Sequence, residues 1–93
     1  METKKEKKME RTEIAEILKT VLYEKIGEMM RIKKEDMKDD MHLFEDTGMD
    51  SLDFLEVIME MEEELGIVIP DDNLDHVTRI GELVDVMYEI VND

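Results

Sequence analysis

Apolar residues between Thr12 and Ile26 recur at intervals of three and four, which places them on one face of a helix. The members of this face are Ile14, Ile17, Leu18, Val21, Leu22 and Ile26. Gly27 and the charged stretch 31–40 break the periodicity, and we expect a long connection to follow. The isolated apolar residues that would anchor this connection to a core are Ile32, Met37, Leu43 and Phe44. A loop of this length usually has a function.

A second helical pattern runs from Ser51 to Leu65, and Gly66 stands just past its end, where a left-handed residue is favoured. The expected core face contains Phe54, Val57, Ile58, Met61 and Leu65. At about 100° per residue, a second apolar stripe lies roughly 130° from that face and borders acidic residues. This second stripe consists of Leu52, Leu55 and Met59. It fits a docking face for a basic partner, although a helix buried on two sides would show the same pattern.

The last third of the chain begins with the apolar segment 67–69 and Pro70. A lone strand would have no pairing partner, so we expect an extended connector there. Asp71 is expected to cap a short helical turn carrying Leu74 and Val77, and Thr78 is expected to cap the last helix. The face of that helix is Ile80, Leu83, Val84, Met87 and Val91. The sequence therefore predicts an all-α four-helix bundle with three longer helices, one short helix and a long first loop.

Charge narrows the range of partners. The 93 residues contain 27 acidic against 12 basic side chains, and the net charge is −15. Such a surface repels nucleic acid and anionic lipid, so basic protein surfaces are the expected partners. No apolar run is long enough to span a membrane, and the absence of cysteine excludes disulfides and thiolate metal sites.

The first ten residues mix lysine and glutamate without an apolar stretch, which argues against a secretory signal. We expect residues 1–10 to form a flexible charged extension and residues 11–93 to form a single domain. A chain of this size has little room for the walls of a catalytic cleft. The expectation is a cytoplasmic monomer whose partners supply the chemistry.

Ser51 stands where the second helix is predicted to begin. Its hydroxyl could cap exposed backbone N–H groups, which is the usual role of a serine at such a position. A helix N-terminus also favours an attached phosphate, because unpaired N–H groups and the helix dipole face it. The position of Ser51 alone leaves both interpretations open.

The segment from Glu45 to Asp53 resembles the attachment motif of acyl carrier proteins, whose centre is Asp-Ser-Leu, here Asp50, Ser51 and Leu52. The resemblance extends from Leu43 to Val91 without a gap, through Glu62–Leu65, Ile69–Asp72 and the Val77–Thr78 step. It implies that a phosphopantetheinyl transferase attaches 4′-phosphopantetheine from coenzyme A to Ser51. The thiol of this arm would carry acyl groups as thioesters, so the protein would be a carrier and not an enzyme, with no catalytic residue and no metal ligand.

The same resemblance implies roles for further residues. Asp50 and Leu52 would flank the attached arm. The residues expected to meet basic patches on acyl-chain biosynthetic enzymes are Asp53, Leu55, Glu56, Met59, Glu62 and Glu63. The residues expected to line a pocket for the acyl chain are Phe44, Leu55, Ile58, Met59, Ile67 and Ile69. An ordinary packed core without a pocket is the alternative.

The pathway is open at this point. Fatty acid synthesis is the first expectation, while Thr47, Glu60, Ile67 and Val68 depart from the common pattern of the family. A specialised carrier in polyketide, lipid or nonribosomal peptide synthesis is an alternative. A second alternative is an acidic helical interaction module that carries nothing, although this leaves the Asp-Ser-Leu motif unexplained.

Other classes of protein fit the sequence poorly. The Asp-Thr-Gly triplet at 46–48 matches the aspartic protease signature, but it precedes a helical pattern where that mechanism needs strands. A calcium loop with Gly48 at its sixth position would place Leu43 and Phe54 where oxygen ligands are required. There is no G-x-S-x-G motif for a serine hydrolase, and we interpret His42 and His76 as surface residues.

Overall fold

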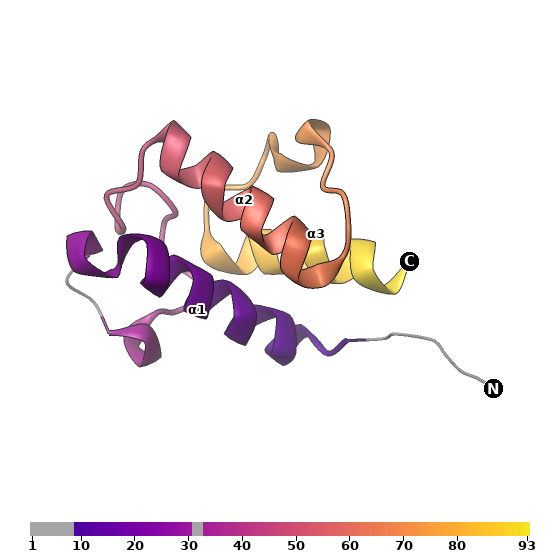
Figure 1. The fold of residues 1–93 in the computed structure, drawn as a ribbon, viewed down its shortest axis with the longest axis horizontal. Helices are drawn as coiled ribbons and strands as arrows, with labels where there is room; N and C mark the ends of the chain where they lie inside the picture. Colours follow the sequence, from indigo (N-terminus) through magenta and orange to yellow (C-terminus); the bar gives the residue numbers. More distant parts are fainter. Residues whose placement is uncertain (1–8, 31–32) are drawn as a thin grey trace.

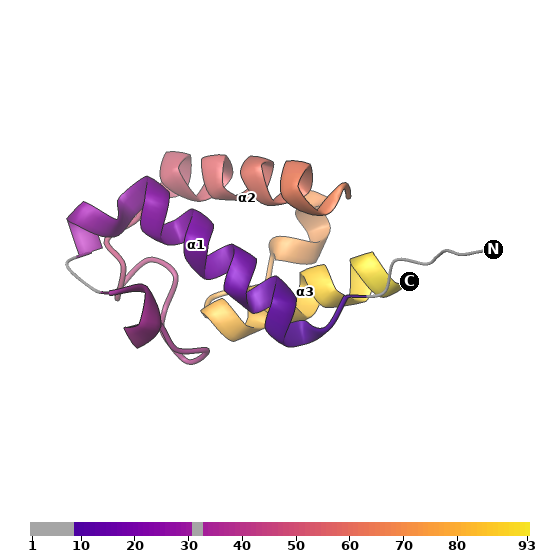
Figure 2. The same cartoon turned by 60° about the horizontal axis from the view of Figure 1, so that its bottom comes forward.

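The computed structural model describes residues 9–30 and 33–93, which form three α-helices and two short 3₁₀ helices. In chain order these are α1 (Arg11–Met30), η2 (Lys34–Asp36), α2 (Ser51–Leu65), η3 (Asp71–Leu74) and α3 (Ile80–Asn92). The helix α1 packs against both α2 and α3 and runs in the opposite direction to them (Figures 1 and 2). Residues 9–30 and 33–93 contain no strand, and their one extended pairing is an isolated bridge between His42 and Arg79.

The all-helical class is confirmed, but the count of four helices is not. The short helix expected around Leu74 and Val77 is a single 3₁₀ turn, Asp71–Leu74. Its hydrogen bonds span three residues, from Asn73 N–H to the Pro70 carbonyl and from Asp75 N–H to the Asp72 carbonyl. So short a segment cannot offset the cost of starting an α-helix, and it remains a tight turn.

The first helix is longer than its apolar pattern predicts. It continues to Met30, past Gly27, where the apolar periodicity breaks. A Cβ atom on Gly27 would lie 3.0 Å from Cδ1 of the Tyr23 ring. Glycine therefore lets the ring lie against the helix, and a glycine within a helix costs only about 1 kcal/mol. The predicted anchor Ile32 lies outside the described residues.

The start of α3 also differs from the prediction. Arg79, and not Thr78, occupies the N-cap position. The Thr78 N–H and hydroxyl both donate to Glu82 Oε1, at 2.9 and 3.0 Å, and the Arg79 N–H donates to the same oxygen at 2.9 Å. These bonds, from Thr78 N–H first and then Arg79 N–H, lower the pKa of the Glu82 carboxyl. The Thr78 carbonyl accepts from Leu43 N–H at 2.8 Å, which ties this step to the long connection.

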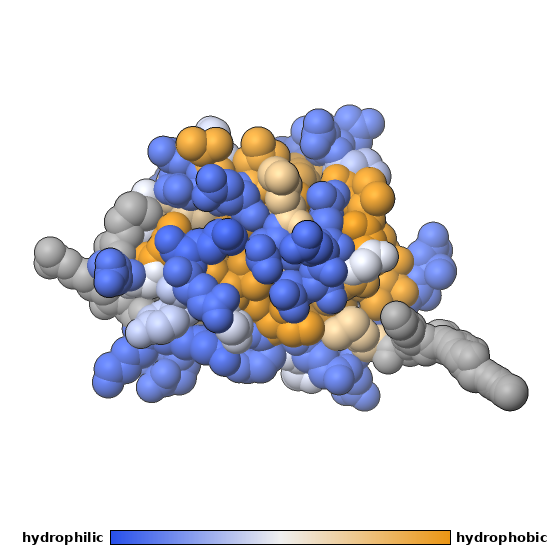
Figure 3. Space-filling model, in the orientation of Figure 1, coloured by the Kyte–Doolittle hydropathy of each residue, from blue (hydrophilic) through white to orange (hydrophobic). Residues whose placement is uncertain are grey.

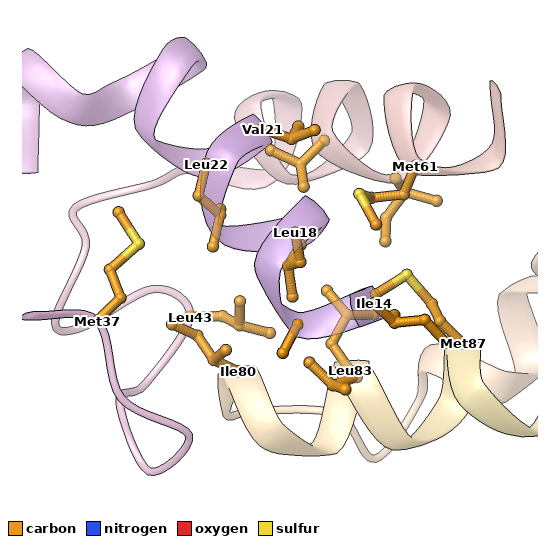
Figure 4. Close-up of a cluster of buried hydrophobic side chains, with 14 of the residues drawn as sticks. Ile14, Leu18, Val21, Leu22, Met37, Leu43, Met61, Ile80, Leu83 and Met87 are labelled. Atoms are coloured by element: carbon orange, nitrogen blue, oxygen red, sulfur yellow. The ribbon is translucent and has the colours of Figure 1, made fainter. Parts of the chain in front are cut away.

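The predicted apolar faces meet in one core (Figure 4). Val57, Ile58 and Met61 are buried on α2, while Phe54 and Leu65 are half-buried at its ends. Met37 and Leu43 are buried as predicted, so the long connection is anchored at two points, and Phe44 is half-buried. The completely buried larger side chains are Ile14, Leu18, Leu22, Leu43, Met61, Ile80, Leu83, Met87, Val57 and Val84.

The two ends of the described chain are joined by paired amide hydrogen bonds. Met9 N–H donates to Asn92 Oδ1 at 3.1 Å, and Asn92 Nδ2 donates to the Met9 carbonyl at 3.0 Å. Met9 therefore packs on the domain, while residues 1–8 of the predicted extension lie outside the described residues. Within the described ranges, no helix is both long and apolar enough to cross a membrane.

Candidate functional site

Ser51 is the first residue of α2, and its side chain is exposed. The N-cap is Asp50: its Oδ1 accepts from Asp53 N–H at 2.9 Å, and Asp53 Oδ2 accepts from Asp50 N–H at 3.3 Å. This reciprocal pair is a capping box, so the interpretation of Ser51 as the capping residue is wrong. The structure therefore leaves the Ser51 hydroxyl outside the cap and facing solvent.

A helical turn lies directly before Ser51 in the chain. We refer to residues 42–50 as the 42–50 turn. The His42 carbonyl accepts from Asp46 N–H at 3.3 Å, and the Phe44 carbonyl accepts from Gly48 N–H at 2.9 Å. Gly48 then adopts a left-handed conformation with φ of 79°, which a residue with a side chain rarely takes. These bonds end the turn and direct the backbone into α2.

Thr47, one of the departures from the family pattern, is 2% exposed. Its hydroxyl donates to the Leu43 carbonyl and accepts from Met49 N–H at 3.2 Å. A buried hydroxyl is costly unless it is hydrogen-bonded, and this one is bonded as both donor and acceptor. Thr47 therefore fastens the turn internally.

The role of His42 was not predicted from the sequence. Its Nδ1 accepts from Phe44 N–H at 3.2 Å and Glu45 N–H at 3.1 Å, while its own backbone N–H donates to Asp46 Oδ2 at 2.7 Å. His42 is half-buried, so its interpretation as a simple surface residue is wrong, whereas His76 is exposed. The spacing of His42 and Asp46, four residues apart at the start of a turn, is the signal that could have indicated this cap.

The second apolar stripe of α2 faces solvent. Leu52, Leu55 and Met59 are 63%, 52% and 59% exposed, so the alternative of a helix buried on two sides does not hold. In Figure 3, hydrophobic surface shows between hydrophilic side chains on the face formed by α1 and α2. We refer to these three residues as the apolar strip.

Acidic side chains accompany the apolar strip. Glu56 and Glu63 are exposed, while Glu60 is half-buried with its Oε1 4.0 Å from Lys25 Nζ. A surface hollow of about 350 Å³ lies between α1 and α2 at this point. Its lining residues are Lys25, Glu56, Met59, Glu60 and Glu63.

Glu62 holds the connector that follows α2. Its Oε2 accepts from Ile69 N–H at 2.7 Å, and its carbonyl accepts from Ile67 N–H at 3.1 Å. Gly66 ends the helix with φ of 66°, as its position predicts, and its N–H also points to the Glu62 carbonyl. Glu62 thus binds the extended connector 67–69 through its backbone and its carboxylate, a contact that helical periodicity alone could not predict.

Replacing Glu62 by alanine is expected to lower the free energy of unfolding by about 1–2 kcal/mol, because Ile69 N–H loses its acceptor. Glu62→Gln keeps an acceptor oxygen and should retain most of this stability. Glu63→Ala removes an exposed carboxylate one position away and should change stability by less than about 0.5 kcal/mol. Urea unfolding of the three variants measures these differences, and equal values for Glu62→Ala and Glu63→Ala would contradict the role of the bond.

The residues predicted to line an acyl pocket occupy two environments. Ile58 and Ile69 are buried, and Phe44 and Ile67 are half-buried against the core. Leu55 and Met59 lie instead on the exposed apolar strip. The structure brings four of the six residues to the core side of α2 and its connector.

The residues around Ser51 are compatible with an attached phosphate. The hydroxyl is exposed, and N–H groups of the first turn have no acceptor within the helix. The dipole of the 15-residue helix α2 also favours negative charge at this end. The described part of the chain holds no group of three or more His, Cys, Asp or Glu side chains arranged to bind a metal ion.

Comparison with known proteins agrees with this arrangement. Residues 12–87 match the family model described as "Phosphopantetheine attachment site". The chain therefore belongs to the acyl carrier protein family, whose members bear 4′-phosphopantetheine and act as carriers, not as enzymes.

An acyl carrier protein of Chloroherpeton thalassium is 36% identical over 72 residues, which cover 77% of this chain and 90% of the relative. The solved structure of the acyl carrier protein from Enterococcus faecalis is similar with a TM-score of 0.70 at 22% identity. That similarity covers 88% of this chain and 99% of the other, and it shows the shared fold.

Proposed function

We propose that Ser51 carries the 4′-phosphopantetheine arm and that the protein presents acyl intermediates to enzymes of fatty acid synthesis. The observation that carries this proposal is the placement of Ser51. Ser51 is the only serine of the sequence, and it lies exposed at the start of α2. Asp50, and not Ser51, caps the helix. When attached, the group supplies a terminal thiol that holds acyl chains as thioesters.

The surface beside Ser51 supports a role in docking. The apolar strip begins one residue after Ser51, and Glu56 and Glu63 lie exposed beside it. We propose that these residues, with Asp53 and the exposed part of Glu62, meet basic patches on the phosphopantetheinyl transferase and on acyl-chain biosynthetic enzymes. Asp50 and Leu52 would flank the arm.

The core side of α2 is the proposed site for the acyl chain. Ile58 and Ile69 are buried there, and Phe44 and Ile67 pack against the same core. We propose that these four side chains line the space that an acyl chain would occupy, with Leu55 and Met59 contacting it at the exposed edge of α2.

The 36% identity to a curated acyl carrier protein over most of both chains supports a carrier role, and fatty acid synthesis is the pathway that we propose for it. Specialised carriers of polyketide, lipid or nonribosomal peptide synthesis are the alternatives. The family match argues against an acidic module that carries nothing. We further propose a cytoplasmic monomer in which residues 11–93 form the carrier domain.

Attachment is tested by incubating the protein with coenzyme A and a broad-specificity phosphopantetheinyl transferase, followed by intact-protein mass spectrometry. The expected result is one added arm per chain, and an unmodified chain would contradict the proposal. The pathway is tested by offering the modified protein to a malonyl transferase of fatty acid synthesis and to an amino-acid-adenylating enzyme of peptide synthesis. Loading by the first alone is expected.

Charge reversal on α2 should weaken docking. In Glu56→Lys combined with Glu63→Lys, two exposed acids that would face a basic partner become repulsive, and affinity for the transferase should fall about tenfold at low salt. The loss should shrink as salt rises, because salt screens exposed charges. Glu89→Lys on α3 is the control, since Glu89 is also exposed but lies on another helix. An affinity that does not respond to the α2 changes would argue against this docking face.

A further inference from the structure

The imidazole of His42 is held in one protonation state by the 42–50 turn. Two backbone donors, Phe44 N–H and Glu45 N–H, approach its Nδ1 at 3.2 and 3.1 Å. A ring nitrogen that accepts hydrogen bonds carries no proton, so the ring is neutral with its proton on Nε2. That nitrogen lies 4.0 Å from Glu45 Oε2.

Contacts continue from His42 to the start of α2. The Phe44 N–H is held by His42 Nδ1, and the Phe44 carbonyl accepts from Gly48 N–H at 2.9 Å. The Phe44 ring lies 5.3 Å from the Phe54 ring of α2, measured between centroids. The His42 ring therefore holds the first residues of the 42–50 turn. The last residues of the same turn lead directly into Ser51.

A proton on Nδ1 would remove both of these bonds at once. The Phe44 and Glu45 N–H groups would then face a third N–H group and have no acceptor. Two carboxylates face His42: Glu45, whose Oε2 lies 4.0 Å from Nε2, and Asp46, whose Oδ2 accepts from the His42 N–H. Arg79, the N-cap of α3, also lies beside His42: its backbone bridges His42, and its guanidinium donates to the Asp40 carbonyl.

We propose that His42 is a positioning residue for Ser51. The neutral ring holds the 42–50 turn in the geometry that the transferase recognises, and protonation of Nδ1 releases the turn and slows attachment of the arm. The inference rests on the proposed function of Ser51. Attachment would then respond to pH through the two hydrogen bonds at His42 Nδ1.

The first experiment uses the unmodified chain and does not depend on attachment. Amide hydrogen exchange followed by NMR, corrected for intrinsic rates, should show protection at Phe44 and Glu45 falling by about fivefold or more from pH 8 to pH 5. In His42→Asn the side-chain oxygen accepts without titrating, so protection should stay level. His42→Ala should be unprotected at both pH values, and His76→Asn should behave as wild type. Level protection in the wild-type chain would overturn the proposal.

The second experiment measures the attachment rate with one transferase at both pH values. Between pH 8 and pH 5, the attachment rate of the wild-type chain should fall several-fold more than that of His42→Asn. Both proteins are modified by the same transferase, so the pH response of the enzyme itself cancels when the two ratios are compared. Equal ratios for the two proteins would overturn the positioning role even if the turn loosens. If neither protein accepts an arm at any pH, the proposed function of Ser51 fails, while the exchange data still report on His42.

Discussion

Ser51→Ala is expected to abolish attachment of phosphopantetheine completely. The sequence contains no other serine, and Thr47, the nearest hydroxyl, is buried and bonded within the 42–50 turn. Intact-protein mass spectrometry after incubation with coenzyme A and a transferase should show an arm on the wild-type chain and none on the variant.

The loss should not come from unfolding. Ser51 is exposed and does not cap α2, so its replacement by alanine should change the free energy of unfolding by less than about 0.5 kcal/mol. Asp50→Ala is the complementary variant: it removes the capping carboxylate and should cost about 1 kcal/mol, while the Ser51 hydroxyl stays in place. An arm on Ser51→Ala would move the attachment site to one of the threonines.

Leu18→Ala is expected to lower the free energy of unfolding by about 3–5 kcal/mol, the range found when a buried leucine is truncated. Leu18 lies completely buried on α1, the helix that packs against both α2 and α3 (Figure 4). A cavity there would loosen both interfaces. Small domains have a total stability of about 5–15 kcal/mol, so the variant should be close to unfolding, which urea titration followed by circular dichroism measures.

Leu52→Ala is the matched control, because it is the same truncation on the exposed apolar strip. It should leave stability within about 0.5 kcal/mol of wild type while weakening affinity for the transferase. Comparable losses of stability in Leu18→Ala and Leu52→Ala would mean that the strip is packed against the domain. Comparison of the two variants thus distinguishes a residue of the core, Leu18 on α1, from a residue of the proposed docking face, Leu52 on α2.

The sequence predicted α2 best because its limits are set by local chemistry. Asp50 and Ser51 suit a helix start, Gly66 suits a helix end, and the side-chain periodicity between them separates a buried face from an exposed strip. The family motif lies on the same element, which is why the candidate site could be placed before the structure was known.

The predictions that were wrong concern residues whose roles are set by contacts between separate elements of the fold. Thr78 is a plausible cap until its carbonyl is paired with Leu43 N–H. The roles of His42 and Glu62 depend on backbone N–H groups of a turn and a connector, whose direction does not follow from hydrophobic periodicity. Local sequence signals therefore predicted the helices, while the hydrogen bonds between elements became visible only in the structure.

The tie between Met9 and Asn92 has a practical consequence for work with this carrier. It brings the beginning of α1 and the last turn of α3 together at one end of the bundle, whereas α2 begins at the opposite end (Figure 1). A biotin or a surface tether placed after Asp93 would therefore point Ser51 into solution. Chains immobilised in this way would form an oriented layer, in which transferases and acyl-handling enzymes could be compared on identically presented carriers.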